Sequence, residues 1–219
     1  KKTALPPIAT PQEWEASRQA LLAREKALTR MQDELAAERR RLPMVPVEDN
    51  YTFTGPHGEV GLVDLFEGRR QLIVYCAMLE PGATPCEGCS MVMDNIGHNL
   101  AHVNARDTTF VFTSPAPQHE ILALQKRMHW QAPWYTDHQR RFADAFGAGK
   151  GFAINVFIRD DDNLVYRTYF STDRGGELFD THFRLLDITP YGRQEQWEDS
   201  PGGWPQSEPY QWWRMHDDY

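Results

Sequence analysis

Long apolar runs and cysteines are scarce in this sequence, and each shortage excludes a class of protein. No apolar run approaches the roughly 20 residues that a membrane-spanning helix needs. The first residues, Lys1 to Pro7, contain no hydrophobic stretch of signal-peptide length. Three cysteines are an odd number and too few for a disulfide framework in 219 residues. We therefore expect a cytoplasmic protein without a membrane partner, whose paired cysteines serve redox or metal chemistry.

A surplus of positive charge is also missing. The formal net charge is -8, whereas a nucleic-acid partner would require a basic stripe that displaces counterions. We therefore expect no nucleic-acid partner. Hydrophobic residues make up 41% of the chain and aromatic residues 12%, which is enough to bury a sizeable core. The length suits one α/β domain with an extension.

The N-terminal part predicts a long amphipathic helix over residues 11–42. Thr10 is suited to cap it, Pro11 to occupy its first turn, and Glu13 to complete a capping box, while Pro43 prevents continuation. Apolar residues recur every seven positions at Trp14, Leu21, Leu28, Leu35 and Leu42. The alternate heptad positions are polar, which disfavours a regular coiled coil. The helix is expected to lie across its own domain; the alternative is a dimerisation arm, which would make a homodimer.

From residue 50 the pattern becomes that of a mixed sheet. The sequence predicts strands at 51–53, 60–62, 72–76, 108–113, 153–158 and 165–170, and helices at 90–103, 119–129 and 178–186. Residues 134–146 suggest a loop with a short helix, and the tail from 194 holds four tryptophans without any period. The order of elements implies a central sheet with helices on both faces. We expect an N-terminal extension (1–46), one domain (47–193), and a tail (194–219) packed on it.

The motif Cys86-Glu87-Gly88-Cys89 is the strongest candidate for chemistry. Cys86 follows Pro85 and directly precedes a predicted helix, where unpaired backbone N–H groups and the helix dipole favour a thiolate. Cys89 would fall in the first turn, close enough to form a disulfide with Cys86. We expect Cys86 to attack a disulfide or peroxide and Cys89 to resolve the intermediate, without a cofactor. Cys76, on an apolar strand, is expected to be an inert core residue.

A metal site is the alternative use of these thiols. Cys86 and Cys89 could bind copper or zinc together with histidine, the candidates being His98, His102, His129 and His138. The dithiol and the first two histidines would lie about two turns apart on one helix, roughly 15 Å at 1.5 Å per residue, so one ion could not join them unless the helix breaks. Separately, Trp134 and Tyr135 are candidates to border a substrate groove.

Several segments resemble peroxiredoxin-related proteins of the thioredoxin fold. These are Tyr51-Thr52-Phe53, Gly55-Pro56-His57-Gly58, Asp64-Leu65-Phe66-Glu67-Gly68 and Leu72-Ile73-Val74-Tyr75, with Phe110-Val111-Phe112-Thr113-Ser114 and Trp130-Gln131-Ala132-Pro133-Trp134 later. Nearly the whole chain is similar to a bacterial and fungal thioredoxin-like family whose function is formally unassigned. That resemblance rests also on Glu13-Trp14, Arg39-Arg40-Arg41-Leu42-Pro43, the dithiol, Leu186-Asp187-Ile188-Thr189-Pro190-Tyr191-Gly192-Arg193 and Trp213-Arg214-Met215-His216-Asp217-Asp218-Tyr219. It implies a thioredoxin-like fold and a dithiol rather than a known reaction.

The sequence departs from the two best-known members of that fold. No threonine stands three residues before Cys86 or Cys89, as the peroxide-reacting cysteine of peroxiredoxins requires. Gly151-Phe152-Ala153 stands before Ile154, where thioredoxins carry a cis-proline, and a bare backbone there would leave room for a metal. We therefore expect a thiol-disulfide oxidoreductase acting on a protein or small-molecule disulfide or thiol. The alternatives are a metal-binding protein, a peroxide reductase and a non-catalytic interaction module.

Overall fold

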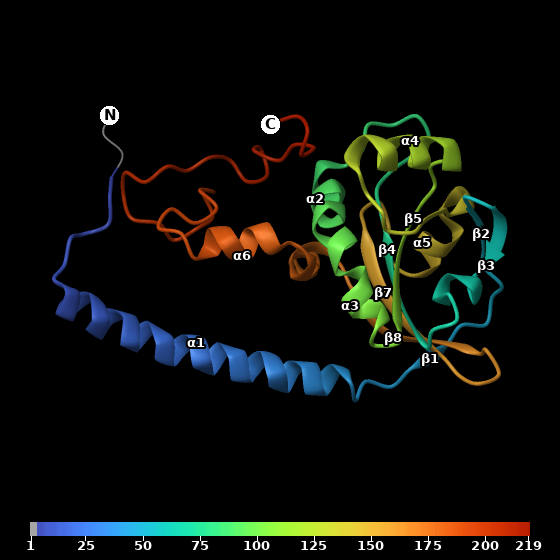
Figure 1. Ribbon diagram of the computed structural model, residues 1–219, viewed down its shortest axis with the longest axis horizontal. Helices are drawn as coiled ribbons and strands as arrows, with labels where there is room; N and C mark the ends of the chain where they lie inside the picture. The colour runs from blue at the N-terminus through green and yellow to red at the C-terminus, as the bar shows by residue number, and fades with distance from the viewer. Residues whose placement is uncertain (1–3) are drawn as a thin grey trace. The chain divides into compact units, whose positions relative to one another are not determined.

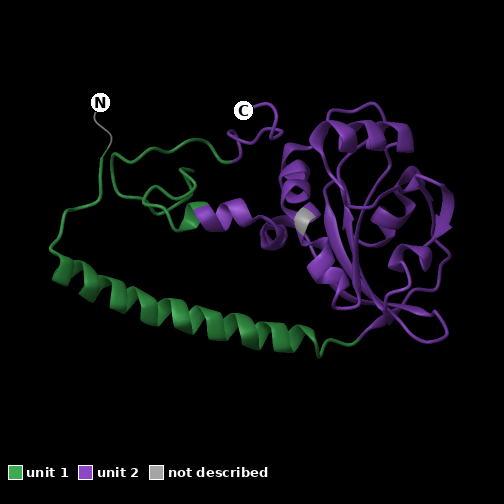
Figure 2. Ribbon diagram, in the orientation of Figure 1, with its two compact units in different colours: residues 1–43, 186–209 green, residues 44–185, 210–219 purple. Residues whose placement is uncertain are grey.

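The computed structural model describes residues 4–219, except for the side chain of His98 (Figure 1). The chain divides into two compact units, one of residues 1–43 and 186–209 and the other of residues 44–185 and 210–219 (Figure 2). The domain boundaries expected from the sequence stay predictions; the division falls after residues 43, 185 and 209. Within residues 4–219, every helix is too short or too polar to span a bilayer.

The first unit contains the long N-terminal helix, α1 (Pro11–Arg39). Its capping box forms as expected, because the backbone N–H of Glu13 donates to Thr10 Oγ1 at 3.3 Å and that of Thr10 to Glu13 Oε2 at 2.9 Å. No residue of α1 is buried, and its leucine stripe is exposed. The helix ends three residues earlier than expected, and Leu42 lies in the turn that follows.

The other part of the first unit, residues 186–209, begins with the last two residues of a helix (Thr181–Asp187) and is otherwise irregular, but a buried polar network holds it. Arg193 donates to both carboxylate oxygens of Asp187, at 2.8 and 3.0 Å. The carboxylate of Glu195 is buried and accepts from the indole N–H of Trp197. The ring of Tyr191 packs edge-on against Trp204, 5.3 Å between centroids. Aromatic packing and hydrogen bonds therefore order a segment that has no secondary-structure period.

The second unit is built on an eight-stranded sheet in the order β1-β8-β7-β4-β5-β6-β2-β3. Its strands are β1 (Val45–Pro46), β2 (Thr52–Gly55), β3 (Gly58–Gly61), β4 (Gln71–Cys76), β5 (Thr108–Ser114), β6 (Trp134–Thr136), β7 (Ala153–Arg159) and β8 (Val165–Ser171). The helices are α2 (Glu87–Ile96), α3 (Leu100–Asn104), α4 (Gln118–Met128), α5 (Arg141–Ala145) and α6 (Thr181–Asp187), with 3-10 turns at η1 (Asp64–Phe66), η2 (Gly97–Asn99), η3 (His138–Arg140) and η4 (Asp173–Phe179).

The central four strands have thioredoxin-like topology. β4 and β5 are parallel and joined through α2 and α3, whereas β7 pairs antiparallel with β4 and β8 antiparallel with β7. The resulting order, β8-β7-β4-β5, places a βαβ unit beside a hairpin that leads into α6. The fold class predicted from the sequence, a mixed sheet with flanking helices and a long N-terminal helix, is confirmed.

Alternate residues of β4 enter two separate cores. Leu72, Val74 and Cys76 face a core on one side of the sheet, while Tyr75 faces the other. The first core includes Phe142 and Phe157; the second includes residues of α2 and α4. The strand is therefore buried on both faces, as its continuous apolar run predicted.

Several predicted elements differ from the structure, among them the helix expected at 178–186, which is divided at Asp180 into η4 and α6. The helix expected at 90–103 begins at Glu87 instead, and it passes through 3-10 geometry at Gly97–Asn99 before α3. It starts earlier because the thiol of Cys86 caps it, and cysteine is not among the residues by which helix starts are recognised. The segment from residue 134, expected as a loop, begins with β6, which pairs with β5.

A substitution of Phe142 tests the packing of the aromatic core on the side of the sheet that Leu72, Val74 and Cys76 face. Phe142 is fully buried, with ring centroids 4.6 Å from Phe146 and 5.3 Å from Phe53. We predict that Phe142→Ala lowers the free energy of unfolding by about 3–5 kcal/mol, because it leaves a cavity. Leu164→Ala, at a 58% exposed position, serves as the control and should change it by less than about 0.5 kcal/mol. Chemical denaturation measures both, and equal effects would contradict the packing described.

Candidate active site at the Cys86–Cys89 dithiol

The dithiol lies at the start of α2, after the loop that follows the central strand β4. Cys86 is the N-cap of α2 with an extended backbone (φ -68°, ψ 121°), and its carbonyl accepts from the backbone N–H of Ser90 at 3.0 Å. Cys89 is in the first helical turn, and its backbone N–H donates to Cys86 Sγ at 3.4 Å. The two sulfurs therefore share the positive end of one helix.

The surroundings of Cys86 favour its ionised form, the thiolate. The pKa of Cys86 is lowered to about 6, first by the hydrogen bond from the Cys89 thiol and then by the backbone N–H groups of Cys89 and Gly88. Partial burial and the carboxylate of Glu87 oppose this shift, but Glu87 is exposed and contributes least. At neutral pH the half-buried Cys86 is therefore mainly a thiolate.

Cys89 is the protonated partner. It is 4% exposed, and its sulfur accepts from the backbone N–H of Met78 at 3.4 Å and from the Tyr75 hydroxyl at 3.7 Å. The hydrogen bond to Cys86 and burial raise the pKa of Cys89 well above its ordinary value. The dithiol thus consists of an accessible thiolate and a buried thiol, which is the distribution that the roles expected for Cys86 and Cys89 require.

A cavity of about 390 Å³ opens beside the two sulfurs. Its aromatic walls include Tyr75, Phe152, Phe183 and Trp213, and its charged walls are Asp173, Arg174, Glu177 and Asp180. Phe152, directly before β7, stacks on Tyr75 with an interplanar angle of 6° and 5.3 Å between centroids. The expectation of a bare backbone with room for a metal at this point is therefore wrong, since a phenyl ring occupies it.

Tyr210 and Trp213, both in the last ten residues of the chain, form one wall of this cavity. Trp213 lies so close to Gly88 that a Cβ there would be 2.8 Å from its indole Cζ3. Met215 is buried and accepts a hydrogen bond at Sδ from Ser90 Oγ at 3.0 Å. Gly88 is thus the small residue that lets the C-terminal segment pack against the dithiol turn.

The structure places Trp134 and Tyr135 away from the dithiol cavity. Trp134 is buried on β6 and donates to Ser114 Oγ at 2.9 Å, while the ring of Tyr135 lies against Gly55 in the opposite core. They face opposite sides because neighbouring residues of a strand alternate. Neither is among the described residues that line this cavity, so a part for them in substrate binding stays a prediction.

The histidines of the metal alternative do not gather at the thiols. His102 is exposed on α3, His129 is exposed at the end of α4 and lines a different cavity, and His138 Nε2 lies 2.7 Å from Thr54 Oγ1. The side chain of His98 lies outside the described residues. Within the described part of the chain, no three His, Cys, Asp or Glu side chains are arranged to hold an ion.

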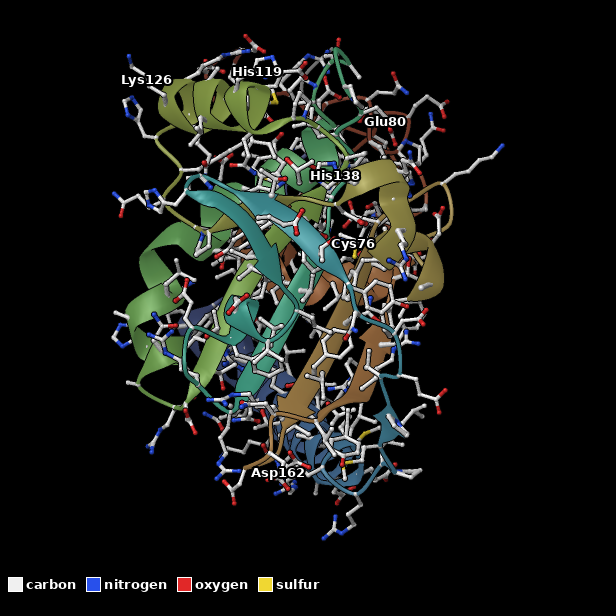
Figure 3. The ribbon with its side chains drawn as sticks, turned by 90° about the vertical axis from the view of Figure 1, so that its right-hand side faces the viewer. Cys76, Glu80, His119, Lys126, His138 and Asp162 are labelled. Atoms are coloured by element: carbon white, nitrogen blue, oxygen red, sulfur yellow. The ribbon has the colours of Figure 1, made fainter. Side chains whose placement is uncertain are left out.

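Cys76 lies in the core, as expected. It is 2% exposed, and burial raises the pKa of its thiol to about 12. Figure 3 shows it at the carboxyl end of β4, toward the same end of the sheet as Glu80 and His138, while Asp162 marks the β7–β8 turn at the opposite end. A thiol so buried and so weakly acidic is inert as a nucleophile.

A family model described as "Bacterial protein of unknown function (DUF899)" matches residues 3–219. The chain belongs to this family. The prediction of a thioredoxin-like family without an assigned reaction is thereby confirmed. No curated protein matches the DUF899 chain significantly.

Two solved structures are similar to this DUF899 chain. Peroxidoxin BcpB from Mycobacterium tuberculosis is 17% identical and covers 66% of this chain and 97% of its own, with a TM-score of 0.45. A hypothetical protein from Sinorhizobium meliloti 1021 is 13% identical and covers 60% of this chain and 71% of its own, with a TM-score of 0.41. At these identities neither transfers an activity to the DUF899 chain.

The acidity of Cys86 yields a test. Alkylation of Cys86 by iodoacetamide should rise with pH through a midpoint of about 6, because only the thiolate reacts. Cys89→Ala removes the largest stabilising hydrogen bond, so the midpoint should move up toward the ordinary cysteine pKa of about 8.5. Cys89→Ser keeps a hydroxyl donor and should move it less. Mass spectrometry locates the label, and an unchanged midpoint in Cys89→Ala would refute this origin of the acidity.

The packing of Trp213 on Gly88 yields another test. Gly88→Ala should lower the free energy of unfolding by about 1–3 kcal/mol, because the indole must move. The matched control is Gly97→Ala, since a Cβ there meets nothing within 4 Å, and alanine should be neutral or mildly stabilising. Gly88→Ala should lose its effect in a Trp213→Ala background, as measured by denaturation of all four proteins. Equal effects in both backgrounds would contradict the contact.

Proposed function

We propose that the protein is a thiol-disulfide oxidoreductase that uses the Cys86–Cys89 pair. The observation that supports this most is the asymmetry of the two thiols, one held as a thiolate and the other buried and protonated beside it. A zinc-thiolate site would need both sulfurs deprotonated and further ligands, and the described residues form no group of three His, Cys, Asp or Glu side chains that could hold an ion. A cavity beside Cys86 gives a substrate room to approach.

The reaction has two exchange steps. The Cys86 thiolate attacks one sulfur of a substrate disulfide; a Cys86–substrate disulfide forms, the substrate S–S bond breaks, and the other half leaves as a thiolate. Cys89 then gives up its proton to the departing thiolate and attacks Cys86 Sγ, which releases the second half. The protein pair loses two electrons and the substrate gains them. A dithiol reductant returns the pair to its reduced state by the same chemistry.

Helix capping prepares the first step, and burial delays the second. The Cys89 thiol and backbone N–H groups stabilise the Cys86 thiolate before any substrate arrives, so no proton must leave at the moment of attack. Cys89 stays protonated while Cys86 carries the charge, because two adjacent thiolates would repel each other. Once Cys86 is in a mixed disulfide, its charge is gone and the pKa of Cys89 falls.

Thiol counting in dithiothreitol redox buffers tests the proposal. The wild-type protein should lose two of its three thiols under oxidising conditions and regain them on reduction. Cys89→Ser, mixed with a disulfide of a monothiol such as bis(2-hydroxyethyl) disulfide, should instead accumulate a mixed disulfide on Cys86, whereas Cys86→Ser should form neither product. Cys76→Ala is the control and should cycle like the wild type, because Cys76 lies in the core. Mass spectrometry after acid quenching reports every species.

Two results would count against this proposal. Wild-type protein that keeps all three thiols in oxidising buffer would show that the pair does not cycle. Adducts found on Cys89 in Cys86→Ser but absent from Cys86 in Cys89→Ser would reverse the assigned roles of nucleophile and resolving thiol.

A further inference from the structure

We infer that the substrate of this site is a small organic disulfide without net negative charge, and not the disulfide of a folded protein. This inference rests on the proposed function and deepens it. Three features carry it: the C-terminal wall of the cavity, the contacts that hold that wall, and the charges around the thiolate.

The cavity is bounded on several sides. Cys86 and Gly88 lie on the helix turn, Phe152 lies before β7, and Trp213 and Tyr210 come from the C-terminal segment. A volume of about 390 Å³ is at the small end of the range for ligand cavities, which suits a compact organic molecule. A protein disulfide arrives with backbone on both sides of each cysteine, and Trp213 packs directly on the turn where that backbone would have to lie.

The C-terminal wall is fastened at several separate points. Met215 is 5% exposed, and its Sδ accepts a hydrogen bond from Ser90 Oγ. His216 Nδ1 lies 2.7 Å from Asp94 Oδ1. Arg127 on α4 forms a two-point pair with Asp217, both distances 2.8 Å. Each surface pair contributes little by itself, but together with the buried methionine they fix the segment. The cavity is therefore preformed, with Trp213 as a specificity-determining residue.

The charged residues of the cavity favour or disfavour a substrate according to the sign of its charge. Asp173, Glu177 and Asp180 contribute three carboxylates, while among the described lining residues the one cation is Arg174, which donates to Glu177 at 2.7 and 3.3 Å. With the Cys86 thiolate, the site carries a negative surplus. Like charge disfavours an anionic disulfide such as glutathione disulfide, and the aromatic walls favour an apolar body.

A panel of disulfides separates these features. The reduced protein is mixed with cystamine (a dication), bis(2-hydroxyethyl) disulfide (neutral), glutathione disulfide (anionic) and insulin, and formation of the Cys86–Cys89 disulfide is timed. Each rate constant is divided by that of dithiothreitol with the same disulfide, which removes the intrinsic reactivity of the substrate. The normalised values for cystamine and the neutral disulfide should exceed that for glutathione disulfide about tenfold and that for insulin about a hundredfold.

The charge contribution has its own variants. Asp173→Asn keeps side-chain shape and suits the left-handed backbone at this residue (φ 48°), so it removes charge with little strain. It should narrow the preference for cystamine over glutathione disulfide several-fold, and added salt should narrow it in the wild type. Asp162→Asn, at the far hairpin turn, is the matched control and should leave the preference unchanged.

The wall has its own variants. Trp213→Ala should raise the normalised insulin rate about tenfold relative to that of cystamine, while Trp204→Ala, in the other unit, should not. Should Trp213→Ala fold poorly, the wild type supplies a second measurement. Cys86 should react with N-ethylmaleimide much faster than with a maleimide on a large polyethylene glycol chain. Equal rates for the two maleimides, corrected for their reactivity with dithiothreitol, would overturn the inference that the cavity walls keep large substrates from Cys86.

The outcomes for substrate and function are distinguishable. A pair that cycles in dithiothreitol buffer but reduces insulin or glutathione disulfide as readily as cystamine overturns this inference and leaves the proposed function standing. A pair that forms no disulfide with any oxidant overturns both.

Discussion

The hydrogen bonds that the Cys86 sulfur accepts at the start of α2 are the interaction on which the site depends. They cap the helix, so that α2 begins at Glu87 and carries Cys89 in its first turn. Negative charge on Cys86 is held first by the hydrogen bond from the Cys89 thiol and then by backbone N–H groups that a helix end leaves unpaired. Capping and activation are one arrangement here: a residue that caps less well would also be a weaker acid. Serine in place of Cys86 would keep the cap and lose the nucleophile.

The sheet provides rigid and buried surroundings for Cys89, which the start of α2 alone does not provide. Tyr75 contacts the buried sulfur with its hydroxyl and packs its ring between Phe112 and Phe152. Because β4 is central and paired on both sides, this tyrosine cannot move without disturbing two strands. The backbone N–H of Met78, just beyond the strand, completes the set of donors around Cys89. Strand and helix end thus meet at the two sulfurs, and each fixes one of them.

Sequence patterns captured those parts of the structure whose cause is local. A capping box and heptad stripe predicted α1, and a continuous apolar run predicted β4, because backbone preference and side-chain period act over a few residues. The dithiol was found by its spacing before a helix. Trp213 and Phe152 were missed as cavity walls, since their role depends on contacts between segments far apart in the chain, and no period marks the tail. Trp134 is buried on β6 rather than lying in the expected loop, because the pairing of β6 with β5 depends on residues far apart in the chain.

The negative charges at this site would by themselves disfavour the thiolate form of Cys86. Glu87 raises the pKa of Cys86, and carboxylates in the cavity wall add to the negative surplus around it. A site selected only for an ionised cysteine would carry cations near the sulfur, since opposite charge favours the thiolate. Yet the Cys89 thiol and the backbone donors already bring the pKa of Cys86 to about 6, below neutral pH, and a further decrease would reduce nucleophilicity faster than it added thiolate. The helix end therefore leaves the walls free to carry negative charge, and that charge acts on what binds rather than on whether Cys86 reacts.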